Sequence, residues 1–245
     1  MSRQKHRGQH ANDVKLFHER WIPTLNEAVR DLSWLWSRGY AEKSALELVG
    51  NRYRLNNRQR HALRRAACSD ESVNLRQQLE ISAQELLGKP VAIDGYNLLI
   101  TIEAALAGGI VLHCRDHAYR DIASIHGTYR RVEETIPALS MIGVCLQKME
   151  VSQVHWLLDR PVSNSGRLKG FMMELSEKYE FDWQVELVNN PDRTLSEMEA
   201  WVLISSDGWV LDRAKQWYNL PGQIIGTIPT ANVIHMTGED QGAKM

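Results

Sequence analysis

The sequence has 245 residues, of which 43% are hydrophobic and 24% are charged, and its formal net charge is −1. It is long enough for one large or two modest domains, and no apolar stretch approaches the ~20 residues of a membrane-spanning helix. Residues 1–90 hold sixteen Lys and Arg against ten Asp and Glu, whereas the remainder holds thirteen against twenty. Such asymmetry is typical of a polyanion-binding module joined to a catalytic or metal-binding one, and chance variation in surface charge is the alternative.

The cysteine pattern and the N-terminus indicate the cellular compartment. The three cysteines are far apart and no CxxC pair occurs, so the sequence indicates neither a disulfide framework nor a thiolate zinc site. This pattern fits a reducing environment, and the first ten residues, MSRQKHRGQH, lack the apolar core of a signal peptide. We therefore expect a cytoplasmic protein that does not bind membranes. The oligomeric state stays open.

The N-terminal part of the chain is predicted to be helical. Residues 1–24 are basic, and we expect them to be flexible. Apolar residues then recur at helical spacing, which predicts helices over residues 25–36, 45–50 and 56–67. Proline disfavours helix in the residue before it, so Lys89-Pro90 ends this pattern. We expect a small all-helical domain over residues 25–88.

After Pro90 the pattern changes to short apolar runs that alternate with longer helical stretches. The runs lie at residues 91–93, 110–112, 154–158, 185–188 and 201–204, and helices are predicted at 98–106, 132–148, 168–179 and 208–217. Strands and helices in alternation predict an α/β domain over residues 89–220, with a parallel sheet and helices on both of its faces. Residues 221–245 show little periodicity and are interpreted as a tail.

Carboxylates follow most of these predicted strands. Asp94 ends the first strand, Asp116 follows the second, Asp159 ends the third and Asp207 ends the fifth. In a doubly wound sheet the carboxyl ends of the strands share one edge, so we expect these acids to converge there. A turn explains any one of them, because aspartate suits turns, but it explains four of five strand ends less well.

Converging carboxylates predict a metal site. They repel one another, and a divalent cation offsets this repulsion, with Mg²⁺ or Mn²⁺ favoured by oxygen ligands. Asp94, Asp159 and Asp207 are the predicted metal ligands and catalytic residues, with Asp116 a weaker fourth. Asn97 is a candidate to orient a water molecule or a phosphate beside Asp94.

The segment from residue 51 to residue 65, NRYRLNNRQRHALRR, contains six arginines and no acidic residue. Arginine suits phosphate contacts because its planar guanidinium can bind two oxygens at once. The alternative is a solvated helix face, which charge runs usually form. Four arginines of this segment are the candidate phosphate ligands: Arg58, Arg60, Arg64 and Arg65.

A serine-rich turn lies between the third strand and the next helix. Ser163, Asn164 and Ser165 are good helix N-caps, which is the ordinary interpretation. A helix N-terminus at the edge that carries Asp159 also suits phosphate, with Arg160 as a further contact. We therefore count these four residues as candidate substrate-binding residues.

Two short motifs resemble the PIN and NYN group of nucleases. IDGYN at residues 93–97 resembles their first-strand signature, and SSDGWVLDR at residues 205–213 resembles their late strand, acid and helix signature. The resemblance implies a Rossmann-like sheet with acids at its C-terminal edge. PIN nucleases usually carry a further acid within a helix, and here Glu103, Asp116 or Asp121 is the candidate, which leaves the second ligand open.

A closer resemblance is to the domain of unknown function 434 family. It is carried by SRGY at 37–40, VGNRYRLNNRQR at 49–60, IDGYNLLITIEAAL at 93–106 and LLDRPVSNSG at 157–166. It implies an N-terminal helical module followed by a PIN-like module, without an established activity.

Three functions agree with these features. The first is a Mg²⁺- or Mn²⁺-dependent ribonuclease, in which the acidic site cleaves RNA phosphodiesters and the basic helical module binds the RNA backbone. The second is a non-catalytic RNA-binding or adaptor protein with a PIN-like fold. The third is a small-nucleotide phosphohydrolase that uses the serine-rich turn to bind phosphate. The RNA target and the mode of cleavage stay open.

Overall fold

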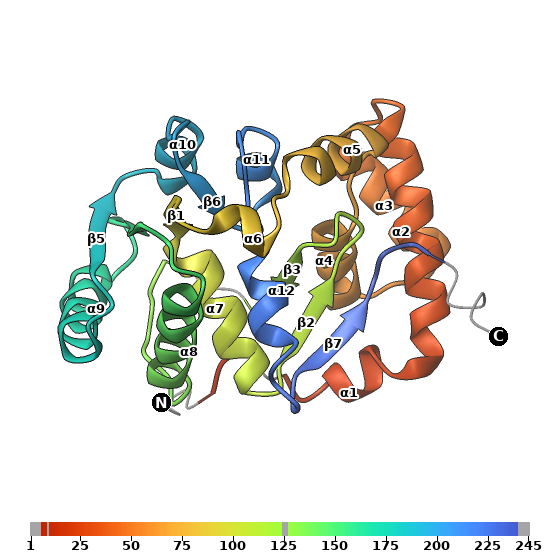
Figure 1. Cartoon of the computed structure of the whole chain (residues 1–245). Helices are drawn as coiled ribbons and strands as arrows, with labels where there is room; N and C mark the ends of the chain where they lie inside the picture. Colours follow the sequence, from red (N-terminus) through yellow and green to blue (C-terminus); the bar gives the residue numbers. More distant parts are fainter. Residues whose placement is uncertain (1–5, 9, 124–126, 240–245) are drawn as a thin grey trace.

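The computed structural model describes residues 6–8, 10–123 and 127–239. Its N-terminal part is helical, as the sequence predicts, and it packs beside two β-sheets (Figure 1). The helices of this part are α1 (Asp13–Leu16), α2 (Ile22–Ser37), α3 (Glu42–Arg52), α4 (Asn57–Ala66), α5 (Asp70–Leu79) and α6 (Ala83–Leu86), with a 3-10 turn at Glu19–Trp21. Reciprocal hydrogen bonds between Asn56 and Gln59 form a capping box that fixes the start of α4.

The larger sheet is parallel throughout, which confirms the predicted α/β class. Its strands are β1 (Pro90–Asp94), β4 (Gln153–Asp159), β5 (Trp183–Val188) and β6 (Val202–Ile204), in the spatial order β5-β4-β1-β6. Every strand therefore ends at the same edge of this sheet. The first and fifth predicted strands, 91–93 and 201–204, become the neighbours β1 and β6.

Helices cover both faces of this sheet, because its strands are apolar on both sides. Val91 and Ile93 belong to the core beneath α7 (Gly95–Leu106), α8 (Thr135–Lys148), α9 (Ser165–Tyr179) and α12 (Leu220–Ile225). Ala92 points the other way and packs with residues of α10 (Pro191–Ser196) and α11 (Gly208–Leu211). α11 is shorter than the predicted helix at 208–217.

The second predicted strand does not join this sheet. It forms β2 (Ile110–His113), which pairs antiparallel with β3 (Tyr119–Asp121) and parallel with β7 (Asn232–His235). The physical reason is that Ile110, Leu112 and Ile234 bury their side chains against the N-terminal helices. The predicted tail thus supplies both α12 and β7, so residues 221–239 are part of the fold.

The N-terminal segment is also tied to the α/β part. Arg7 is buried, and its Nε donates to the buried carboxylate of Glu103 on α7 at 2.7 Å. Tyr129 and Thr135 donate to the other oxygen of Glu103. The expected flexibility of residues 1–24 is therefore wrong for Arg7 and for the helices that follow, while residues 1–5 and 9 lie outside the described part.

None of the helices in the described ranges has the length and apolar character needed to cross a lipid bilayer.

Candidate functional site at the acidic edge

The acidic edge is the group of four aspartates, Asp94, Asp159, Asp192 and Asp207, at the carboxyl ends of the larger sheet's strands. Asp94 and Asp159 are the last residues of β1 and β4, and Asp207 lies three residues beyond β6. Asp192 lies in α10, directly after β5. Every strand of the larger sheet therefore leads to one aspartate.

Asp94 lies deepest, with only 6% of its surface exposed. Ser205 Oγ donates to Asp94 Oδ2 at 2.8 Å. Burial raises the pKa of Asp94 to about 8; the hydrogen bond from Ser205 opposes this shift, and the negative charges of Asp192, Asp207 and Asp159 add to it. The four carboxylates thus act on one another electrostatically, and the charged form of Asp94 is disfavoured in the metal-free protein.

The other three acids differ in their surroundings. Asp192 is exposed, but partial desolvation by its neighbours raises its pKa, and the charges of Asp207 and Asp159 raise it further. Burial also raises the pKa of Asp159. Asp207 instead caps α11, because its Oδ1 accepts the backbone N–H groups of Trp209 and Val210.

Tyr96 is a further polar group near this edge. Only 4% of its surface is exposed, and no described residue accepts a hydrogen bond from its hydroxyl. Burial raises the pKa of Tyr96, and the charge of Asp159 raises it further, so this hydroxyl lies within electrostatic reach of Asp159. This hydroxyl is therefore an unsatisfied polar group beside the acidic edge, enclosed by the protein.

The four aspartates do not form a closed ligand cage. Within residues 6–8, 10–123 and 127–239, no three His, Cys, Asp or Glu side chains lie close enough together to hold a metal ion. One oxygen of Asp94 and one of Asp207 already accept hydrogen bonds from the protein. The acidic edge therefore gathers carboxylates without arranging them as ligands.

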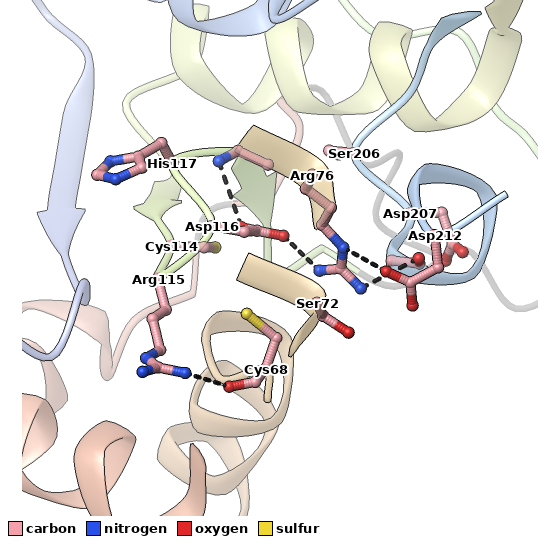
Figure 2. A network of polar contacts seen from close by, with 12 residues as sticks. Cys68, Ser72, Arg76, Cys114, Arg115, Asp116, His117, Ser206, Asp207 and Asp212 are labelled. Carbon is pink, nitrogen blue, oxygen red and sulfur yellow. Dashed lines mark hydrogen bonds and ion pairs between the residues drawn. The ribbon is translucent and has the colours of Figure 1, made fainter. Parts of the chain in front are cut away.

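Asp116 lies in a different network (Figure 2). Its carboxylate accepts a hydrogen bond from Arg76 at 2.5 Å, which Figure 2 shows. It also accepts hydrogen bonds from both terminal nitrogens of Arg120 at 2.8 and 2.6 Å. Burial alone would raise the pKa of Asp116, but the charges and hydrogen bonds of the two arginines hold it well below its usual range. Arg76 and Arg120 therefore neutralise Asp116, so we leave it out of the candidate site, although Arg120 Nε also donates to the backbone oxygen of Ser206 beside Asp207.

Arg76 also joins this network to α11. Its Nε donates to Asp212 at 2.8 Å, and its Nη2 donates to the backbone oxygen of Gly208 at 3.1 Å. The two remaining candidates for a second acidic ligand also have partners within the protein. Glu103 binds Arg7, and Asp121 accepts a hydrogen bond from Thr101 and lies 3.8 Å from Arg65.

The predicted substrate-binding residues outside the arginine segment each have their own partners within the protein. Asn97 Oδ1 accepts hydrogen bonds from the backbone N–H and the hydroxyl of Ser206, so this side chain fixes the loop before Asp207. Asn164 is the N-cap residue of α9 with a left-handed backbone, and its amide donates to Tyr129 rather than capping the helix. Ser165 Oγ donates to the backbone oxygen of Arg160. Ser163 forms an isolated bridge with Thr128.

The four candidate arginines divide into two pairs. Arg58 forms an ion pair with Asp13, and Arg60 donates to the backbone oxygen of Leu55 and to Asn51. These two are engaged within the helical part. Arg64 and Arg65 instead line a cavity of about 580 Å³. Asp207 lines the same cavity, so it joins the basic segment to the acidic edge.

Sequence reasoning missed Asp192, Tyr96 and Ser205. The signal for Asp192 was present, because VELVNNPDR places an aspartate shortly after the predicted strand at 185–188. Tyr96 and Ser205 sit inside the two motifs that resemble nuclease signatures, but tyrosine and serine are also ordinary core and loop residues there. Their burial and their relation to Asp159 and Asp94 become visible only in the fold.

Comparison with known proteins matches two family models. Residues 24–78 match Protein of unknown function (DUF434), which confirms the resemblance in the helical part, and residues 83–223 match Domain of unknown function (DUF5616). An uncharacterized protein of Methanocaldococcus jannaschii is 30% identical over 188 residues, which cover 77% of this chain and 89% of that relative. No solved structure matches the chain.

Proposed function

The chain belongs to the family described as Domain of unknown function (DUF5616), and we propose that it is a Mg²⁺- or Mn²⁺-dependent ribonuclease with a Rossmann-like sheet of the PIN type. One observation supports this most strongly. All strands of the larger sheet lead to one acidic edge, where burial and three neighbouring carboxylates raise the pKa of Asp94 to about 8. Unpaired acids in such surroundings are costly for stability, and such costs concentrate at functional sites.

The donor chemistry of the acidic edge fits a hard divalent cation. Carboxylate oxygens are the ligands that Mg²⁺ and Mn²⁺ prefer, and the Tyr96 hydroxyl is a buried group without a protein acceptor. No closed cage exists among the described residues, so binding requires the carboxylates to turn toward one another. Their mutual repulsion opposes this approach when no cation is present. Asp94, Asp159, Asp192 and Asp207 are the residues that would hold the ion.

The remaining chemistry is the hydrolysis of the phosphodiester by water. A bound cation stabilises the negative charge that develops on the phosphoryl oxygens. Hydrolysis forms a bond from a water oxygen to phosphorus and breaks the bond from phosphorus to the leaving nucleotide's oxygen. The proton that the water loses passes to solvent, because the four carboxylates of the acidic edge are assigned to the ion. The leaving oxygen takes a proton from solvent, so atoms and charge balance.

The proposal is tested with Asp192→Asn, which keeps the side chain's shape and removes its charge. We expect Mn²⁺ to raise the Tm of the parent and to support cleavage of single-stranded RNA, and we expect both effects to fall in the variant. Asp182→Asn is the matched control. Asp182 directly precedes β5, at the opposite end of the sheet, and its left-handed backbone suits asparagine. Equal Mn²⁺ effects in parent and Asp192→Asn would contradict the proposal.

A non-catalytic RNA-binding protein is the second candidate, favoured by the lack of a closed ligand cage among the described residues. It predicts RNA binding by the parent without any Mn²⁺-dependent shift in Tm and without cleavage. The same measurements therefore separate the two functions.

A further inference from the structure

The cavity beside Asp207 has the size and the lining of a nucleotide site. We name it the arginine pocket, after Arg64 and Arg65 at the end of α4. Its volume of about 580 Å³ lies within the range of small-molecule sites. The helical part contributes Trp36 and Tyr40 to its lining, and α11 contributes Trp209. The pocket therefore lies where the basic helices meet the acidic edge.

The pocket presents cationic groups that the protein does not neutralise. Arg64 is exposed and makes no hydrogen bond or ion pair with any residue in the described ranges. Arg65 lies 3.8 Å from Asp121, which is a long ion pair, and 25% of its side chain is exposed. The other two lining arginines, Arg76 and Arg120, are buried and held by acids. The Arg64 guanidinium is thus available to an anion, and Arg65, which Asp121 holds only by this long contact, adds a second positive charge to the lining.

Two buried donors at the same pocket also lack acceptors. Arg65 Nε and Trp36 Nε1 are shielded from solvent, and neither donates to an acceptor in the part of the chain that the structure describes. Buried N–H groups normally find acceptors, so these two are unsatisfied donors just behind the pocket wall, which adds to the positive potential of the lining without contacting the cavity. Ser69 Oγ donates to Ser72 Oγ at 3.3 Å, so the Ser72 hydroxyl is a further donor in the lining, and Ser72 is drawn in Figure 2.

Aromatic rings complete the recognition of a nucleotide. Trp209 is 44% exposed and Tyr40 is 55% exposed, and both line the pocket. The guanidinium of Arg213 lies 4.0 Å from the centre of the Trp209 ring, which holds that ring from one side. Exposed aromatic rings bind unpaired bases by stacking.

From these features we propose that the arginine pocket binds the terminal nucleotide of a single-stranded RNA through its terminal phosphate. This rests on the proposed function and specifies its substrate. Arg64 and Arg65 bind the phosphomonoester, and Trp209 and Tyr40 contact the base. Since Asp207 lines the pocket and belongs to the acidic edge, the bond presented for hydrolysis is the one next to the bound nucleotide. Cleavage is therefore exonucleolytic.

The binding test uses one RNA sequence with a 5′-phosphate, a 3′-phosphate or two hydroxyl ends, measured by fluorescence anisotropy in EDTA. We expect one phosphorylated end to bind at least about tenfold more tightly than the hydroxyl form, because charged hydrogen bonds are the strong ones. Arg64→Gln/Arg65→Gln should abolish this preference. Arg52→Gln/Arg54→Gln, in the same basic segment but outside the pocket lining, should retain it. No end preference in the parent, or a preference that survives in Arg64→Gln/Arg65→Gln, would overturn the proposal.

The cleavage test uses linear and circular forms of the same RNA with Mn²⁺. We expect degradation of the phosphorylated linear form and none of the circle. Cleavage of the circle would overturn the arginine-pocket proposal and leave the proposed ribonuclease standing. An end preference in EDTA without any Mn²⁺-dependent cleavage would leave the pocket standing and refute the ribonuclease.

Discussion

At the scale of single residues, Asp94 shows why a strand ends on a carboxylate here. A turn aspartate would be solvated, whereas Asp94 is buried and lies within the electrostatic reach of three other acids. Its only protein donor among the described residues is Ser205. The residue therefore costs the metal-free protein stability, and this cost can be measured.

Replacing Asp94 by asparagine should change how stability depends on pH. Burial raises the folded-state pKa of Asp94 from its ordinary value of 3.8 to about 8, so between these values the folded chain binds more protons than the unfolded chain. Stability of the parent must fall as pH rises through this window, by an amount on the order of a few kcal/mol. We expect the Tm advantage of Asp94→Asn over the parent, measured in EDTA, to grow steadily from pH 5 to pH 8.

The same variant should lose most of the Tm increase that Mn²⁺ gives the parent, because that increase depends on the affinity of the folded state for the ion. Asp182→Asn again serves as control. If the difference between Asp94→Asn and the parent is independent of pH, Asp94 is an ordinary turn residue.

Arg7 is the second residue whose role can be tested singly. It is the cation that pairs with Glu103, which is fully buried. Arg7→Met leaves that carboxylate without its charge partner and should destabilise the protein by about 3–5 kcal/mol. Arg7→Met/Glu103→Gln removes both charges while Gln still accepts from Tyr129, so it should recover much of the loss. Urea unfolding measures both, and a double variant as unstable as Arg7→Met would contradict this account.

At the scale of elements, the junction of β2 and β7 carries a histidine pair. His113 Nδ1 lies 3.1 Å from His235 Nδ1, and its ring stacks on Tyr119. Burial, together with the positive charges of His235 and His117, lowers the pKa of His113 to about 4, and the charge of Asp116 opposes this shift. The unfolded chain therefore binds more protons than the folded chain between about pH 4 and the ordinary value of 6.5.

Stability should accordingly fall as pH decreases from 6.5 to 4, since protons favour the unfolded chain. His113→Asn keeps a polar atom near the position of Nδ1 but does not titrate, so its Tm should fall less than that of the parent over this range. His10→Asn, at an exposed position, is the control and should follow the parent. If the Tm of His113→Asn and that of the parent depend on pH in the same way, the titration of His113 does not contribute to stability.

The elements also show what the sequence could predict. Helical periodicity and the apolar runs at 91–93 and 154–158 predict local structure correctly, because the periodic burial of apolar side chains acts within a few residues. The sheet assignment of β2 could not be predicted. An apolar strand such as IVLH satisfies either sheet, and its partners are decided by distant contacts with Ile234 and the N-terminal helices.

The candidate site likewise contains features that the sequence predicts and features that distant contacts decide. The convergence of Asp94, Asp159 and Asp207 at one edge follows from the parallel order of β1, β4 and β6. The neutralisation of Asp116 by Arg76 and Arg120 depends on where β2 lies. The ion pair between Arg58 and Asp13 likewise depends on the packing of α1 against α4. Residue type alone therefore identifies charged candidates, but tertiary partners decide which of them remain free.

At the scale of the whole molecule, the C-terminal segment packs against both the α/β part and the N-terminal helices. The C-terminal segment after residue 220 contributes buried side chains to the main core and to the core beneath the N-terminal helices: Ile224, Ile225, Ile228, Ile234 and Met236. It also forms hydrogen bonds with the rest of the chain. The backbone N–H of Met236 donates to the backbone oxygen of His113, and the side-chain amide of Asn26 donates to the backbone oxygen of His235. The helical part and the sheets thus share one set of contacts.

Truncation of the chain tests whether the contacts of the C-terminal segment are needed for cooperative folding. A chain that ends at residue 220 loses β7, exposes the free edge of β2 and opens the apolar surface beneath α2, so we expect it to show no cooperative thermal transition. A chain that ends at residue 239 keeps every described element and should match the full chain in Tm. Far-UV circular dichroism follows helices and sheets together, while near-UV circular dichroism follows the packing of the eight tryptophans, which lie in both the helical and the α/β part. In the full chain both should change in a single transition. Two separated transitions, or cooperative unfolding of the chain that ends at residue 220, would show that the helical and α/β parts fold independently.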